Sequence, residues 1–139
     1  MSETRAASST TSAGSGLPEA VRIVVAEDHA EMADVLQTYL EAAGYEVHLA
    51  NDPVLAERTI GEVRPALVVL DANMPGLSGW TLLSRLKADG AAGPLVVMLT
   101  GDDDFPAESA SADVILRKPA ALRRVAAVLA ELLEKPKSA

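Results

Sequence analysis

The sequence predicts an α/β fold in which a parallel β-sheet is covered by helices on both faces. From Ala20 onward, short apolar segments alternate with helical patterns without a break. Most of these segments run uninterrupted through Val, Leu and Ile, which is typical of strands that are buried on both sides. Strands that alternate with helices in this way form parallel sheets.

Five strands are expected, at residues 22–27, 46–49, 66–70, 95–99 and 114–117. In the first half of the chain, helices over 30–43 and 53–63 separate them. Apolar residues recur at helical spacing in the first helix, and Gly44 provides a stop signal. Asp52-Pro53 marks the start of the second helix, because an acid suits the N-cap position and proline suits the first turn.

In the second half, Ser78-Gly79 begins a helix that is expected to end near Gly90, and residues 120–134 form the last helix. The segment from Gly101 to Asp113 fits neither pattern, since it carries five acidic residues, no basic residue and one large apolar side chain, Phe105. It has room for about two helical turns. We expect a loop with a short or irregular fourth helix.

The domain organisation follows from composition. The chain has 139 residues, of which 49% are hydrophobic, and this length suits one domain with one core. We expect that domain to span residues 20–135, followed by a C-terminal tail at 136–139. Residues 1–19 are rich in Ser, Thr, Ala and Gly, so they bury too little to offset their ordering entropy and are expected to form a disordered tail.

Charge and cysteine content exclude several classes of function. The net charge of −8 disfavours nucleic-acid binding, which needs clustered basic residues. The absence of cysteine excludes disulfides, thiolate zinc sites and cysteine nucleophiles. No apolar run approaches the roughly 20 residues of a membrane span, and the N-terminus lacks a secretory pattern. We therefore expect a cytoplasmic protein that binds neither nucleic acid nor membrane.

Residues able to perform chemistry stand where four of the strands end, namely Glu27 and Asp28, Asp71, Thr100, and Lys118. In open α/β sheets, ligands bind beyond the carboxyl ends of the strands. Three carboxylates, a hydroxyl and an amine at this edge predict a site for a divalent cation and a phosphoryl group. Magnesium suits it, because this ion prefers oxygen ligands and needs only one or two carboxylates. A backbone carbonyl near Asn73 can add a ligand.

The chemistry of such a site centres on Asp71. A carboxylate and a phosphoryl group are both anionic, and a magnesium ion between their oxygens removes the repulsion. Lys118 can place a point charge on the phosphoryl oxygens, and Thr100 can donate a hydrogen bond to one of them. Asp71 joined to a phosphoryl group would be an acyl phosphate, which is a labile species suited to signalling.

The set of residues resembles the receiver domain of two-component response regulators, the CheY-like superfamily, over about residues 20 to 135. The matching residues are Glu27-Asp28, Asp71, Met74-Pro75-Gly76, Gly79, Thr100 and Lys118-Pro119. Each motif alone is weak, but their order and spacing together are specific. The resemblance implies a flavodoxin-like (βα)5 sheet with strand order 2-1-3-4-5, and a cis Lys118–Pro119 bond.

The resemblance also implies a function. Asp71 would take a phosphoryl group from a phosphohistidine on a sensor histidine kinase or histidine phosphotransfer protein, and so switch the binding of an unknown downstream protein. Asp28, Asp71 and the Asn73 carbonyl would hold Mg²⁺ or Mn²⁺ directly, and Glu27 would act through water. Asn73 and Asp102 would tune the lifetime of the acyl phosphate. The protein would be a signalling phospho-acceptor that assists only its own phosphotransfer and dephosphorylation, and not an enzyme.

Two features depart from the family pattern. Ile115 stands where the family usually has an aromatic switch residue, three places before Lys118. The stretch between Thr100 and Lys118 is about four residues, or one helical turn, shorter than usual. We therefore hypothesise that this receiver signals through a different face or a reshaped loop.

Several alternatives stay open from the sequence. The chain reads as a stand-alone receiver, because it stops after its last helix, but a receiver fragment of a hybrid histidine kinase would look the same. Ile115 and the shortened loop fit a pseudo-receiver that binds without phosphorylation, but the intact set of acid pair, Asp71, Thr100 and Lys118 disfavours it. An aspartyl hydrolase of the haloacid-dehalogenase type is disfavoured, since Asn73 occupies the place of its second aspartate. His29 adjoins the acid pair, so contact with the metal is one interpretation, but a loop residue is favoured because magnesium prefers oxygen.

Overall fold

The computed structural model describes residues 20–88, 93–101 and 105–134. The tails expected at 1–19 and 136–139 lie outside these ranges, as does Asp102. Strands and helices alternate along the chain in the order β1 (Arg22–Ala26), α1 (Ala30–Ala42), β2 (Glu46–Ala50), α2 (Pro53–Val63), β3 (Leu67–Asp71), α3 (Gly79–Lys87), β4 (Leu95–Thr100), η3 (Ala107–Ser111), β5 (Val114–Arg117) and α4 (Leu122–Glu134).

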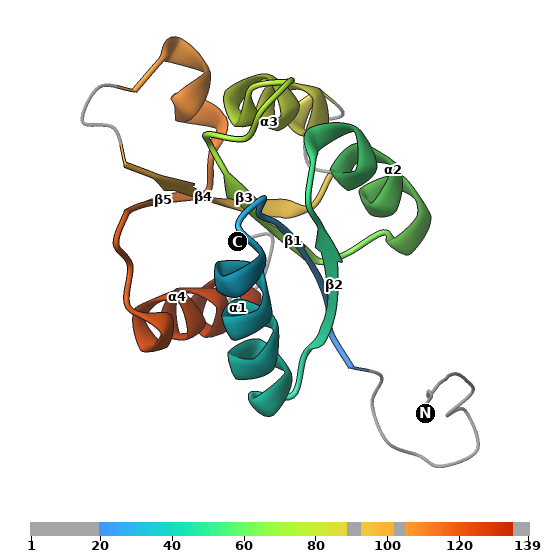
Figure 1. The fold of residues 1–139 in the computed structure, drawn as a ribbon, viewed down its shortest axis with the longest axis vertical. Helices are drawn as coiled ribbons and strands as arrows, with labels where there is room; N and C mark the ends of the chain where they lie inside the picture. Colours follow the sequence, from blue (N-terminus) through green and yellow to red (C-terminus); the bar gives the residue numbers. More distant parts are fainter. Residues whose placement is uncertain (1–19, 89–92, 102–104, 135–139) are drawn as a thin grey trace.

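The five strands form one parallel sheet with the order β2-β1-β3-β4-β5 (Figure 1). This order confirms the expected flavodoxin-like fold. The chain leaves β2 and crosses over β1 to add β3, so the direction of winding reverses at β1. Open α/β sheets bind their ligands at such a reversal, beyond the carboxyl ends of the strands on either side. Here those ends are Ala26 and Asp71.

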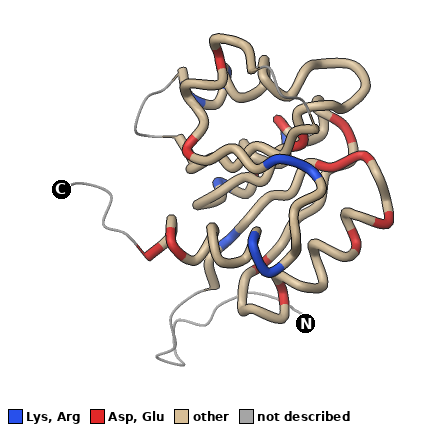
Figure 2. Tube along the Cα trace, turned by 90° about the vertical axis from the view of Figure 1, so that its left-hand side faces the viewer, with Lys and Arg blue, Asp and Glu red and all other residues tan. Residues whose placement is uncertain are grey.

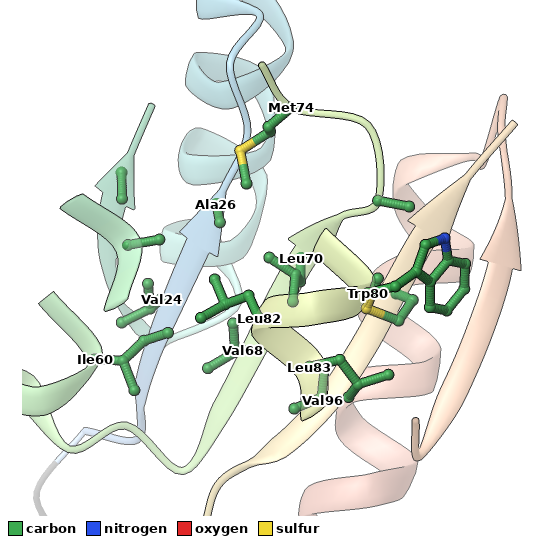
Figure 3. Packing of buried hydrophobic residues seen from close by; sticks show 14 residues of the cluster. Val24, Ala26, Ile60, Val68, Leu70, Met74, Trp80, Leu82, Leu83 and Val96 are labelled. Atoms are coloured by element: carbon green, nitrogen blue, oxygen red, sulfur yellow. The ribbon is translucent and has the colours of Figure 1, made fainter. Parts of the chain in front are cut away.

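Helices cover both faces of the sheet, with α2 and α3 on one side and α1 and α4 on the other (Figure 1). Neighbouring residues of a strand point to opposite faces, so each strand feeds two apolar layers. Towards α2 and α3, Val24, Val68 and Val96 pack in one cluster with Ile60, Leu82 and Leu83 (Figure 3). Towards α1 and α4, the second cluster contains Ile23, Val69, Val97, Leu36, Leu40, Val125 and Leu129.

The start signals read from the sequence act as hydrogen-bonding caps. The Asp52 carboxylate accepts a hydrogen bond of 2.8 Å from the backbone N–H of Leu55, and the Ser78 hydroxyl accepts one of 3.1 Å from the N–H of Trp80. Each bond satisfies a donor that the first turn of a helix leaves unpaired. The cap at Ser78 fixes where the chain turns back after β3, and this turn borders the candidate site.

The expected short fourth helix is a 3-10 helix of five residues, η3. Phe105 precedes it, and its ring centroid lies 6.1 Å from that of Trp80 at a tilt of 44°. Trp80 is buried and Phe105 is exposed. The reduced segment is therefore anchored to α3 through an aromatic contact.

Charged residues are spread over the elements, and along the described trace they are mainly acidic (Figure 2). The basic residues form short separate stretches in that view. Among the described residues, no helix combines the length and the apolar character needed to cross a membrane.

Candidate functional site

The sequence-predicted carboxylates meet at the carboxyl edge of the sheet because of the strand register. Ala26 of β1 lies opposite Leu70 of β3, so the residues that follow them, Glu27 and Asp71, lie side by side at the ends of the two strands. Asp28 follows Glu27. Glu27 and Asp71 are both buried, at 2% and 0% exposure. Two acidic side chains are thus held away from water within one small volume.

The Asp71 carboxylate has one oxygen with partners and one without. Lys118 Nζ lies 3.0 Å from Asp71 Oδ1, and the backbone N–H of Asn73 donates to the same oxygen over 3.0 Å. Asp71 Oδ2 is buried and has no hydrogen-bond partner among the described residues. An unpartnered oxygen of a buried carboxylate is costly, and it is the atom expected to meet a ligand.

Lys118 is placed by the end of β5 and by its neighbour β4. Its backbone N–H donates to the carbonyl of Thr100, the last residue of β4, over 2.7 Å. The Lys118–Pro119 peptide bond is cis, as the resemblance implies. The amine reaches back towards the acids and also lies 3.9 Å from Glu27 Oε1. Lys118 therefore contacts two carboxylates, and Asp28 adds a third to the same cluster, so the acids outnumber the lysine.

The surplus of negative charge fits a cation. Four side chains each offer a ligand atom, and these atoms all lie within 4.8 Å of one another. They belong to Glu27, Asp28, His29 and Asp71. Within the described part of the chain, Glu27 Oε1 and Asp28 Oδ1 are, like Asp71 Oδ2, buried atoms without a hydrogen-bond partner. Oxygen donors at this spacing match the preference of Mg²⁺. The residues present thus fit the expected metal.

The environment also shifts the pKa of two of these groups, Glu27 and His29. Burial raises the pKa of Glu27, and the nearby negative charge of Asp71 adds to the rise, while hydrogen bonds from His29 oppose it. A hydrogen bond to Glu27 and the charges of Asp28 and Glu27 raise the pKa of His29. The rise at Glu27 thus comes mainly from burial, and the rise at His29 comes from the acids beside it.

Gly79 lets the backbone close tightly around the end of β3. Its N–H donates to the Ala72 carbonyl over 3.1 Å. A Cβ atom at this position would lie 2.5 Å from the Asp71 carbonyl oxygen and 2.7 Å from the Cα of Ala72. Such distances are well below van der Waals contact, so a side chain here would displace the strand end that carries Asp71.

The remaining predicted residues lie around this centre. Thr100 is fully buried at the end of β4, and Asn73 is exposed in the loop after β3. Ile115 is half-buried and packs against the apolar cluster beneath α2 and α3. Asp102 lies outside the described residues. The structure therefore gathers Glu27, Asp28, Asp71 and Lys118, with Thr100 at the adjacent strand end.

The sequence favours a loop residue over a metal ligand at His29, and the structure places its ring beside the acid pair. This residue is the N-cap of α1, and its Nδ1 atom lies 3.1 Å from Glu27 Oε2 and 3.4 Å from Asp28 Oδ1. Its place directly after the acid pair was the available signal. The bend that turns the ring back towards Glu27 could not be read from local sequence.

Comparison with known proteins agrees with the fold and the edge just described. The family model of the response regulator receiver domain matches residues 23–130. Response regulator MprA of Mycobacterium ulcerans is 35% identical over 120 residues, which cover 84% of this chain and 52% of that protein. MprA of Mycobacterium sp. strain KMS is 36% identical over 118 residues, covering 83% and 51%. The chain thus spans about half the length of these relatives.

Solved structures of response regulators also resemble this chain. A CheY-like response regulator receiver domain protein from Methanospirillum hungatei superposes with a TM-score of 0.78 at 26% identity, covering 84% of this chain and 95% of that one. NtrX from Brucella abortus, solved in complex with ATP, superposes with a TM-score of 0.72 at 28% identity, covering 84% and 27%. Receiver domains are signalling phospho-acceptors of two-component systems, work with sensor kinases and bind Mg²⁺ at an acidic pocket. This chain belongs to the response regulator receiver domain family.

Proposed function

We propose that Asp71 is the phosphoryl acceptor of this receiver. The observation that carries the proposal is the state of its carboxylate. It is wholly buried, Lys118 and Asn73 contact Oδ1, and Oδ2 has no hydrogen-bond partner among the described residues. The two contacts fix the orientation of the carboxylate, and the unpaired oxygen keeps its lone pairs available. Fixed orientation of a nucleophile is a main source of rate in phosphoryl transfer.

The proposed reaction transfers a phosphoryl group from a phosphohistidine. A lone pair of the Asp71 carboxylate forms the new O–P bond while the N–P bond of the donor breaks. The electron pair of that bond stays on the imidazole nitrogen, which takes a proton from solvent. Lys118 holds a positive charge beside the acceptor carboxylate, and Thr100 stands at the adjacent strand end to donate a hydrogen bond to a phosphoryl oxygen.

The proposed cofactor is Mg²⁺ or Mn²⁺, held by Asp28, Asp71 and the Asn73 carbonyl, with Glu27 acting through water. When bound, the ion neutralises charge between the carboxylates and the phosphoryl oxygens. Three buried carboxylate oxygens that have no hydrogen-bond partner among the described residues support this assignment. Asn73 is proposed to tune the rate at which water attacks the acyl phosphate, a role also expected of Asp102.

The proposed donor is a sensor histidine kinase or a histidine phosphotransfer protein, and the output is a change in the binding of a downstream protein. The five-residue η3 and the half-buried Ile115 support an output surface that differs from the family's usual one. A stand-alone protein, a cytoplasmic location and a lack of nucleic-acid binding stay predictions, as does the alternative of a fragment of a hybrid kinase.

Intact-protein mass spectrometry after incubation with acetyl phosphate and Mg²⁺ tests the proposal. We expect one added phosphoryl group on the unmodified chain and none when Mg²⁺ is chelated. A fast-decaying adduct would escape detection, so binding of beryllofluoride, a stable mimic of the phosphoryl group, is measured in parallel through Trp80 fluorescence. If neither ligand binds to the folded protein, the chain is a pseudo-receiver that works without phosphorylation.

A further inference from the structure

His29 is the one feature of the acidic edge that the proposed function does not use. Its side chain is 73% exposed, yet Nδ1 points inward, 3.1 Å from Glu27 Oε2 and 3.4 Å from Asp28 Oδ1. The backbone N–H of the same residue also donates to Glu27 Oε2, over 3.2 Å. Both the main chain and the ring of His29 are therefore tied to one carboxylate, which fixes the ring over the acid cluster.

A second observation points to a ligand at the same place. The Asp71 carboxylate, which is fully buried, belongs to the cluster whose ligand atoms lie within 4.8 Å of one another, and its Oδ2 has no partner among the described residues. Glu27 Oε1 likewise has no hydrogen-bond partner among these residues. Hydrogen bonds within the protein thus leave part of the cluster unsatisfied, although a ring nitrogen is already present beside it.

We infer that His29 supplies a nitrogen ligand to this cation site and so shifts its preference from Mg²⁺ towards a first-row transition cation such as Ni²⁺ or Co²⁺. The inference rests on the cation site of the proposed function. Magnesium binds oxygen ligands, whereas an imidazole nitrogen suits Fe, Ni, Cu and Zn. An imidazole nitrogen added to the carboxylate oxygens forms a mixed donor set, which strengthens transition-metal binding much more than it strengthens Mg²⁺ binding.

The chain offers a matched control, because it contains two histidines and each contacts a glutamate two residues before it. His48 lies on β2, with Nε2 2.7 Å from Glu46 Oε2, and is not part of the acidic cluster. His29→Gln and His48→Gln therefore remove the same ring and the same type of contact. Only the first removes the proposed ligand.

Titration calorimetry of the full, tag-free chain at about pH 8 provides the first test, since imidazole binds metals in its neutral form. We expect His29→Gln to lower the affinity for Ni²⁺ at least about tenfold more than it lowers the affinity for Mg²⁺, in line with the usual cost of disturbing a metal's ligand environment. His48→Gln should leave both affinities unchanged. Equal losses for the two cations, or no loss for Ni²⁺, would overturn the inference.

Pulsed electron paramagnetic resonance of the unmutated protein loaded with Mn²⁺ needs no variant to fold. Nitrogen modulation from an imidazole, absent in His29→Gln and retained in His48→Gln, is the expected result. A spectrum without nitrogen coupling would overturn the inference and leave His29 as a hydrogen-bond partner of Glu27 only.

Failure of this inference is distinguishable from failure of the proposed function. If the unmutated chain takes up a phosphoryl group with Mg²⁺ but shows no nitrogen coupling, only the ligand role of His29 is wrong. Asp28→Asn provides the complementary test, because it should weaken the binding of both Mg²⁺ and Ni²⁺. Unchanged binding of both cations in that variant would show that the cation site itself is wrong, and the inference with it.

Discussion

Two aspartate–lysine pairs lie at opposite edges of the same sheet, and they differ in what surrounds them. At the carboxyl edge, Asp71 meets Lys118 with 3.0 Å between Oδ1 and Nζ. At the amino edge, Asp113 meets Lys87 with 2.7 Å between Oδ2 and Nζ. Asp71 is wholly buried with one oxygen unpartnered among the described residues, whereas the Asp113 and Lys87 side chains are 26% and 19% exposed.

The amino-edge pair has the features of a structural contact. The N–H of Val96 donates to Asp113 Oδ2 over 2.7 Å, and Lys87 donates to the Pro94 carbonyl over 3.1 Å. The pair thus ties the end of α3 to the starts of β4 and β5. At the carboxyl edge, Glu27 and Asp28 lie beside the pair, and the single charge of Lys118 does not balance the negative charges of these acids. Sites that break the rule of satisfied polar groups are expected to be functional, and this contrast supports the assignment of Asp71.

The largest expected effect is on phosphorylation, in which the two aspartates should differ. Asp71→Asn should abolish the phosphoryl adduct formed with acetyl phosphate and Mg²⁺, because an amide oxygen is a poor nucleophile. Asp113→Asn should leave the yield unchanged. Intact-protein mass spectrometry of the two variants measures the difference. An adduct of normal yield on the Asp71 variant would remove the basis of the comparison.

The same two variants should also differ in their free energy of unfolding. Here the larger effect is expected at Asp113 rather than at Asp71. Asp113→Asn removes a charged partner from a partly exposed ion pair and should lower the free energy of unfolding by about 1 kcal/mol. Asp71→Asn relieves repulsion among buried acids and should leave the free energy unchanged or raise it. Urea denaturation followed by Trp80 fluorescence measures both. A large loss of stability in Asp71→Asn would mean that this pair is structural as well.

The two lysines should differ in their effect on cation binding. Lys118→Met removes a positive charge from the acid cluster and should tighten Mg²⁺ binding severalfold, because the cation no longer competes with a neighbouring charge. Lys87→Met lies at the other edge of the sheet and should not change Mg²⁺ affinity. Calorimetric titration provides the measurement. Weaker Mg²⁺ binding in Lys118→Met would contradict the electrostatic account of the site.

The smallest effect is expected at an exposed pair. Arg85 and Glu57 connect α3 to α2 with 2.8 Å between Nη1 and Oε1, and both side chains are roughly half exposed. Arg85→Gln should lower the free energy of unfolding by less than about 0.5 kcal/mol and leave phosphorylation unaffected. Urea denaturation provides the check. If Arg85→Gln lost as much unfolding free energy as Asp113→Asn, the amino-edge pair would contribute no more to stability than an exposed ion pair.

The sequence predicted the fold well because buried parallel strands leave a strong local pattern. Runs such as Leu67–Leu70 and Val96–Leu99 are apolar on both faces, and they proved to be central strands. Their parallel pairing then placed every strand-end residue at one edge. For that reason, the sequence alone predicts that Asp71, Glu27 and Lys118 lie close together. Their roles stay proposals.

The parts that sequence reasoning missed depend on contacts between distant surface groups. No local signal pairs Asp113 with Lys87, which lie 26 residues apart. Met32, Val35 and Tyr39 recur at helical spacing in α1 but are exposed, while only Leu36 and Leu40 of that pattern are buried. Periodicity identifies the helix, but the width of its buried face depends on what packs against it.

The most direct test of the central claim is to locate the phosphoryl group on the chain. Borohydride reduces an acyl phosphate of aspartate to homoserine, and peptide mass spectrometry then identifies the modified position. After treatment with acetyl phosphate and Mg²⁺, the account predicts homoserine at position 71 alone. Homoserine at position 28 or 113 instead, or reduction at no aspartate despite a stable phosphoryl adduct, would contradict it.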